Sequence, residues 1–96
     1  MNSVSVTEVP AGAQLIDVRS QMEWDEGHAK GAIHIPMEEI PSRYGELDLD
    51  SDIYIMCRSG GRSAQVCSWL EKNGIDTINV TGGIIDWEHF ALPMEK

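Results

Sequence analysis

Cys57 stands in a segment whose residue types can activate a thiol. The segment reads CRSGGRS, and it places Arg58 and Arg62 on either side of the pair Gly60-Gly61. Glycines permit a tight turn in which successive backbone N–H groups point inward and form a nest for an anion. Such N–H groups and nearby positive charge both lower a thiol pKa, and the thiolate is the reactive nucleophile. We therefore predict that Cys57 is reactive and substantially ionised at neutral pH, rather than a structural core thiol.

The elements on either side of Cys57 can position it. Ile53–Met56 (IYIM) is fully apolar and rich in residues that favour strands, which predicts a buried central strand. Ser63–Lys72 has the apolar spacing of a helix, and Asn73-Gly74 ends it. The helix N-terminus adds partial positive charge near the loop. Cys57 thus lies where a strand passes into a helix, the usual ligand-binding place in α/β sheets.

The rest of the chain alternates between short strands and helices. Further strands are predicted at Ser3–Val6, Gln14–Val18, Ala32–Ile35 and Thr77–Val80. Helices are predicted from a Ser20 cap through Glu26, over Met37–Leu47 with an interruption at Pro41, and over Ile84–Phe90. This order predicts an α/β fold, a parallel sheet with helices on both faces, in one domain over residues 1–96.

Composition restricts the partners. The net charge of −9 disfavours nucleic acid and anionic membranes. No acidic residue occurs from Ile53 to Leu70, so Cys57 lies in an acid-free segment of an acidic protein. No apolar stretch is long enough to cross a membrane, Met1–Val9 does not resemble a signal peptide, and two cysteines are too few for a disulfide scaffold. We predict a cytoplasmic protein with reduced thiols and, without a strong exposed apolar stripe, a monomer.

Four segments together resemble one known family. The segment CRSGGRS at 57–63 resembles the active-site loop of rhodanese-family sulfurtransferases. Asp17-Val18-Arg19 followed by Glu23 resembles the first signature of that family, and GHAKGAIHIP at 27–36 resembles the second. GGIIDW at 82–87 resembles the C-terminal signature. The segments follow the family's order from about Leu15 to Trp87, so the resemblance covers most of the chain.

The resemblance implies a fold and a reaction. The fold is a three-layer rhodanese-like domain with about five parallel strands. Cys57 is the implied catalytic residue, taking the outer sulfur of a small anionic donor such as thiosulfate as a persulfide and passing it to a thiophilic acceptor such as cyanide. The implied substrate-binding residues are Arg58, Ser59, Gly60, Gly61, Arg62 and Ser63. Guanidinium groups suit the oxyanion of the donor, and no metal or organic cofactor is needed.

Other polar residues are expected to support the structure. The resemblance suggests that Asp17 and Arg19 tie loops together. Glu23 is expected to pair with Arg19. His28 is expected to hydrogen-bond backbone within its own turn. Cys67 is expected to lie in the core, on the apolar face of its helix.

Two alternative functions remain open at this stage. Cysteine phosphatases and arsenate reductases also use a thiolate in an anion cradle, but their loop has one more residue between cysteine and arginine. The shorter loop from Cys57 to Arg62 makes a smaller bowl, better suited to one sulfur atom than to phosphate. The second alternative is a persulfide carrier or binding module that delivers sulfur to a protein partner, and the sequence does not separate it from an enzyme.

Overall fold

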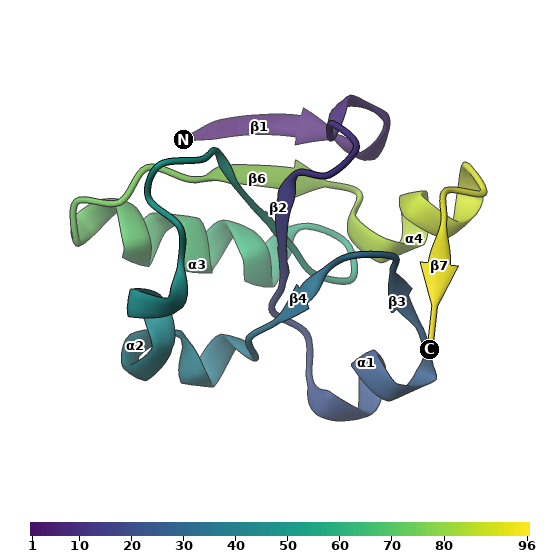
Figure 1. The fold of residues 1–96 in the computed structure, drawn as a ribbon, viewed down its shortest axis with the longest axis horizontal. Coiled ribbons are helices and arrows are strands. Elements are labelled where there is room, and N and C mark those ends of the chain that lie inside the picture. The colour runs from purple at the N-terminus through teal and green to yellow at the C-terminus, as the bar shows by residue number, and fades with distance from the viewer.

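Five short strands form a parallel sheet in the computed structural model, which describes residues 1–96. The strands are β1 (Asn2–Ser5), β2 (Gln14–Asp17), β4 (Ile33–His34), β5 (Ile53–Met56) and β6 (Ile78–Thr81). Their order is β1-β6-β5-β2-β4, and every neighbouring pair is parallel. Figure 1 shows β1 and β6 side by side at one edge of the sheet. Because β5 is the middle strand, the chain leaves it at the centre of the sheet's carboxyl edge.

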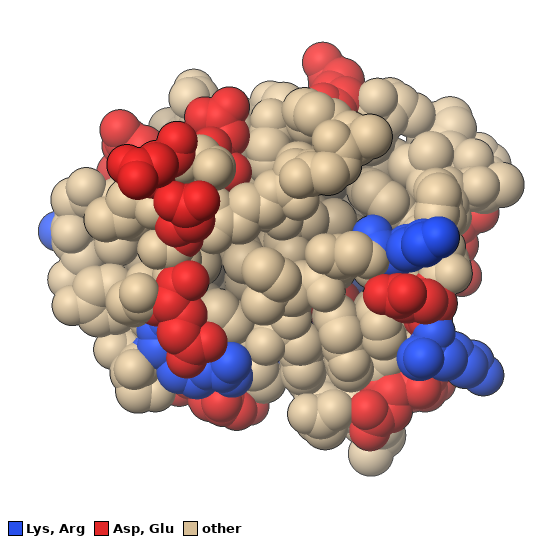
Figure 2. Space-filling model, in the orientation of Figure 1, with Lys and Arg blue, Asp and Glu red and all other residues tan.

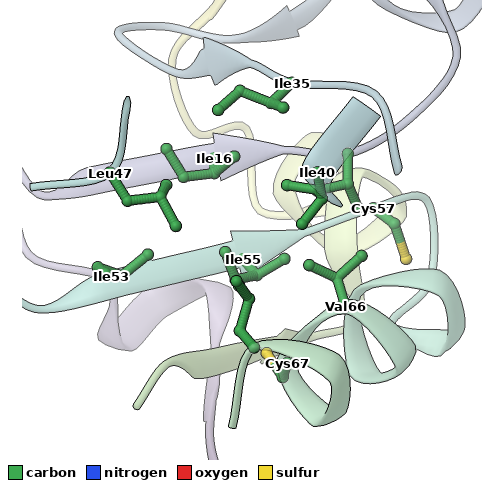
Figure 3. Packing of buried hydrophobic residues seen from close by; sticks show 11 residues of the cluster. Ile16, Ile35, Ile40, Leu47, Ile53, Ile55, Cys57, Val66 and Cys67 are labelled. Atoms are coloured by element: carbon green, nitrogen blue, oxygen red, sulfur yellow. The ribbon is translucent and has the colours of Figure 1, made fainter. Parts of the chain in front are cut away.

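Residues of β5 build the core on both faces of the sheet. All four of them are buried. Since side chains alternate along a strand, Ile53 and Ile55 belong to one apolar cluster and Tyr54 and Met56 to the other. The first cluster continues to Cys57, whose sulfur points toward the start of the following helix in Figure 3. The residue that carries the predicted chemistry is therefore also fixed by core packing.

The helices cover the two faces separately. They are α1 (Gln21–Glu26), α2 (Ile40–Arg43), α3 (Gly61–Lys72) and α4 (Gly83–His89), with single 3₁₀ turns η1 (Val6–Glu8), η2 (Met37–Glu39) and η3 (Tyr44–Glu46). Ile40 of α2 and Leu70 of α3 join the first apolar cluster, whereas Ile84 and Trp87 of α4 join the second. The predicted α/β class, with a five-stranded parallel sheet between two helical layers, is confirmed.

The helix predicted over Met37–Leu47 is the largest departure from the sequence-based expectation. The structure divides this segment into η2, α2 and η3. Pro41 lies in the first turn of α2, where its missing N–H costs no hydrogen bond but prevents a longer helix from running through it. Exposed acidic side chains occur in η2, in η3 and in the connection to β5. They gather along the left edge of the face shown in Figure 2.

A second, two-stranded sheet is absent from the sequence-based prediction. β3 (His28–Ala29) pairs antiparallel with β7 (Met94–Glu95). The carbonyl of Pro93 accepts hydrogen bonds from the N–H of Lys30 at 2.9 Å and from Nε1 of Trp87 at 2.7 Å. Strands of two residues are too short to show an alternating pattern.

No helix in the structure combines the length and the apolar character that a membrane span requires.

The turn Gly82-Gly83 brings the start of α4 against the end of β5. The N–H of Ile84 donates to the carbonyl of Cys57 at 2.9 Å, and that of Ile85 donates to the carbonyl of Arg58 at 3.1 Å. Gly83 has a φ of +51°, and a Cβ there would collide with the carbonyl oxygen of Cys57 and lie 2.6 Å from that of Arg58. This turn therefore acts on the backbone beside Cys57.

Gly83→Ala should therefore destabilise the protein more than a glycine substitution that meets only conformational strain. Gly74 is the matched control, because its φ is +82° and a Cβ there would meet nothing within 4 Å. We expect Gly74→Ala to cost about 1 kcal/mol and Gly83→Ala about 3 kcal/mol, since the methyl group must also displace backbone. Urea denaturation of the two variants measures the difference, and equal losses would contradict the close contact.

Candidate active site

The loop from Cys57 to Ser63 closes around the cysteine sulfur. The chain leaves β5 at Met56 and enters α3 at Gly61, so only a short turn lies between them. Gly60 caps the helix with a φ of +115°, in the left-handed region that favours glycine. This conformation turns the N–H of Gly60 back toward the strand, where it donates to Sγ of Cys57 at 3.1 Å. Gly60 thus provides the tight turn expected of the glycine pair.

Burial and hydrogen bonding act on the Cys57 thiol in opposite directions. Only 1% of Cys57 is exposed, and this burial acts to raise its pKa. Hydrogen bonds at the hydroxyl and amide of Ser63, and at the amides of Gly60 and Ser59, outweigh burial and bring the pKa below its ordinary value. The sulfur is covered, but the surrounding donors face it. Such a site favours a thiolate that is stabilised by hydrogen bonds from the protein rather than from water.

Arg62 does not extend into open solvent beside the thiol. Its two terminal nitrogens donate to the carboxylate of Glu23 at 2.6 and 2.9 Å, a bidentate pair between α3 and α1. The expected pairing of Glu23 with Arg19 is therefore wrong. Arg19 bonds Asp17, at 2.9 Å from its Nε to Oδ2, and donates to the carbonyl of Gly27 at 2.7 Å. Those two residues tie the end of β2 to the end of α1, the structural role suggested for them.

Glu23 connects the cap of α1 to the loop. Oε1 of Glu23 accepts from the backbone N–H and the hydroxyl of Ser20, the N-cap residue, as well as from Arg62. The hydrogen bonds from Arg62, followed by those from Ser20, overcome partial burial and lower the pKa of Glu23 to about 2. The carboxylate is charged at neutral pH and anchors α1 to the start of α3.

Arg58 is the cation that remains free at the loop. It is exposed, and its guanidinium has no hydrogen bond or ion pair within the chain. It borders a shallow cavity of about 280 Å³ whose lining residues are Arg19, Glu23, Glu26, Gly27, Arg58, Ile84 and Glu88. With Arg19 and Glu23 already paired, the charged groups without partners in this cavity are Arg58, Glu26 and Glu88.

A buried asparagine completes the site, and the sequence analysis missed it. Asn79 lies in β6, and its Oδ1 accepts the hydroxyl hydrogen of Ser63 at 2.6 Å. Its Nδ2 donates to the carbonyl of Gly60 at 3.3 Å. The signal available in the sequence was one amide side chain inside the strand segment INVT, which by itself does not show what the amide faces.

The other candidate side chains lie in the core or in turns. Nδ1 of His28 lies 3.0 Å from the carbonyl oxygen of Trp24, which confirms its expected bond to backbone in its own turn. Cys67 is 1% exposed in the apolar cluster, and burial raises the pKa of its thiol. Both cysteines are free, and no three His, Cys, Asp or Glu side chains lie together as metal ligands would.

Glu23→Gln should lower stability in a pH-dependent way. Because folding lowers the pKa of Glu23 from 4.5 to about 2, its stabilisation is complete above pH 4.5 and is lost as the pH falls toward 2. The partly exposed pair is screened by solvent, so we expect a loss of about 1 kcal/mol at neutral pH, shrinking at about pH 3. Urea denaturation at both pH values tests this, with Glu26→Gln, an exposed neighbour in α1, as control. A loss that does not depend on pH would contradict the ion pair.

Comparison with known proteins agrees with this geometry. Residues 7–90 match the family described as Rhodanese-like domain. A sulfurtransferase of Allochromatium vinosum is 41% identical over 81 residues, covering 83% of this chain and 76% of that protein. Thiosulfate sulfurtransferase 16 of Arabidopsis thaliana is 32% identical over 112 residues, covering 96% of this chain and 91% of that protein. The crystal structure of a rhodanese-like domain protein from Staphylococcus aureus superposes with a TM-score of 0.85 at 36% identity, covering 91% of each chain. The chain therefore belongs to the rhodanese-like domain family of sulfurtransferases.

Proposed function

We propose that this sulfurtransferase moves sulfane sulfur through a persulfide on Cys57, with thiosulfate or a similar anion as donor. The observation that carries the proposal is the hydrogen bond from Gly60 N–H to Sγ at 3.1 Å, inside a loop whose other amides also face the sulfur. The free Cys57 thiol has a lowered pKa, which increases the thiolate fraction that attacks. Relatives named as sulfurtransferases support the same chemistry.

The transfer takes place in two balanced steps. The Cys57 thiolate attacks the outer sulfur of thiosulfate, a new S–S bond forms, and the old S–S bond breaks with its electron pair leaving on sulfite. The outer persulfide sulfur then carries the negative charge. Cyanide, or another thiophilic acceptor, attacks that sulfur, thiocyanate leaves, and the electron pair returns to Cys57 as thiolate. The loop amides of Ser59, Gly60 and Ser63 hold the anion in each state.

Arg58 is the residue we propose to hold the donor. It is the free guanidinium beside the loop, whereas the terminal nitrogens of Arg62 are occupied by Glu23. The sequence analysis implied both Arg58 and Arg62 as substrate-binding residues. We propose instead that Arg62 stabilises the loop through its ion pair with Glu23. The backbone around the sulfur and the donor is contributed by Ser59, Gly60, Gly61 and Ser63.

Phosphate ester hydrolysis fits this site poorly. A phosphatase needs a guanidinium directed into its anion bowl to hold the phosphoryl oxygens. Arg62, the arginine at the corresponding end of the loop, directs its terminal nitrogens to Glu23 instead. Together with the shorter loop, this disfavours both phosphatase and arsenate reductase activity.

A protein acceptor is the second candidate for the later half-reaction. Three charged groups around the cavity have no partner, and they are Arg58, Glu26 and Glu88. This surface therefore presents both positive and negative charge to a protein acceptor. A persulfide carrier would share the first step with an enzyme and differ only in its acceptor.

We propose that the protein acts in a compartment that keeps thiols reduced, such as the cytoplasm, since both cysteines are free. We also propose that it is a monomer.

Intact mass after thiosulfate treatment tests the persulfide. We expect the protein to gain one sulfur atom and to lose it when cyanide is added, because the thiolate takes and then releases the outer sulfur. Cys67→Ser is the matched control that should retain the gain, since Cys67 is buried in the core. Cys57→Ser should abolish it. No gain in the unaltered protein, or faster turnover of an aryl phosphate than of thiosulfate, would overturn the proposed reaction.

Arg58→Ala should weaken use of the donor more than it changes the chemical step. We expect KM for thiosulfate to rise about fivefold, corresponding to about 1 kcal/mol for one exposed charge contact, with little change in kcat. Arg43→Ala is the control, because it removes the same charge from α2, where Arg43 pairs with Glu39 and Glu46. Steady-state kinetics at fixed ionic strength compares the two. An equal rise in both variants would assign the effect to net charge alone.

A further inference from the structure

Three buried polar side chains form a chain from the reactive sulfur into the sheet. Sγ of Cys57 lies 3.4 Å from Oγ of Ser63, and that hydroxyl lies 2.6 Å from Oδ1 of Asn79. The exposed fractions are 1% for Cys57, 0% for Ser63 and 5% for Asn79, so no water competes for these bonds. The direction of each hydrogen bond is therefore set by the protein.

Ser63 has one hydroxyl hydrogen and two neighbours that could receive it. The contact with Asn79 is much the shorter, and an amide oxygen is a stronger acceptor than a thiol sulfur. The orientation of the amide is fixed at its other end, where Nδ2 donates to the carbonyl of Gly60 at 3.3 Å. Turning the amide over would bring Oδ1 against that carbonyl oxygen. The hydrogen of Ser63 thus points to Asn79, and a lone pair of its oxygen faces Cys57.

We propose that Asn79 is a positioning residue, which holds the hydroxyl hydrogen of Ser63 away from Cys57 so that backbone amides alone solvate the sulfur anion. The thiol form can donate its S–H to Ser63, whereas the thiolate receives nothing from that hydroxyl while Asn79 holds it. Among the groups that lower the pKa of Cys57, the Ser63 hydroxyl comes first, but it can donate to the thiolate only when its hydrogen turns to the sulfur. While Asn79 holds that hydrogen, the amides of Ser63, Gly60 and Ser59 are the donors that remain. A thiolate with fewer donors keeps more of its nucleophilicity, which falls as a thiol becomes more acidic.

This inference deepens the proposed function but does not depend on sulfur transfer for its test. The readout is the ionisation of Cys57, followed by thiolate absorbance in the far ultraviolet, with Cys57→Ser in each background as the blank. The rate of Cys57 alkylation against pH, resolved from Cys67 by peptide mass, gives an independent value. Persulfide formation can fail while the ionisation result holds, and the reverse also applies.

A double-mutant cycle separates the role of Asn79 in hydrogen-bond direction from its role in holding the loop. The four proteins are the unaltered chain, Ser63→Ala, Asn79→Ala and the double variant. Loss of the bond to Gly60 affects the loop equally with and without Ser63, so it cancels in the cycle. Release of the Ser63 hydroxyl toward the thiolate can occur only where Ser63 is present.

We expect Asn79→Ala to shift the pKa of Cys57 downward by about one unit more when Ser63 is present than when it is Ala. A coupling of zero would make Asn79 a purely structural residue and would overturn the proposal. A coupling of opposite sign would also overturn it, because Asn79 would then be directing the hydroxyl to the sulfur. Asn79→Leu, which preserves side-chain size without either hydrogen-bonding atom, gives the same cycle if Asn79→Ala does not fold.

Discussion

The site depends on one constraint, that a charged sulfur inside the protein must be surrounded by hydrogen-bond donors. Cys57 is packed into the apolar cluster beneath β5, so water contributes almost nothing to the stability of its thiolate. Burial alone would therefore keep the thiol protonated. The amide of Gly60, at 3.1 Å, and those of its neighbours reverse this balance. In this turn Gly60 takes a left-handed conformation, with a φ of +115°, which favours glycine.

Hydrogen bonds from other elements hold the backbone of this loop in place. The carbonyls of Cys57 and Arg58 accept hydrogen bonds from the first turn of α4, and the carbonyl of Gly60 accepts from Asn79 of β6. The carbonyl of Arg58 and the N–H of Ser59 belong to one planar peptide group, so holding that oxygen outward turns the Ser59 N–H the other way, toward the sulfur. The Arg62–Glu23 pair adds a connection to α1. Three separate elements thus set the shape of a loop that local sequence alone only permits.

Local patterns in the sequence were sufficient for the parts of the structure that local chemistry determines. The strand IYIM was predicted with the bounds observed for β5, and the Ser20 cap of α1 and its end at Glu26 were also predicted correctly. The partner of Glu23 was not, because Arg19 and Arg62 are equally suitable cations in the sequence. In the fold, the carboxylate of Asp17, two residues before Arg19, accepts hydrogen bonds from the Arg19 guanidinium. The role of Asn79 was also missed, because its hydrogen-bond partner Ser63 lies on a different element and local sequence does not show that the two side chains meet.

The negative charge of the whole protein and the anion site at Cys57 are compatible because they act over different distances. A net charge of −9 repels an anionic donor and disfavours a thiolate at long range. At physiological ionic strength, however, exposed charges are screened beyond about 8 Å. Donors in contact with the sulfur are inside that distance and are shielded from solvent, so their effect is little reduced. Among the residues that line the cavity, Arg58 carries the only positive charge without a partner. The buried amides therefore stabilise the sulfur anion, and in the proposed mechanism this one exposed charge acts on the donor.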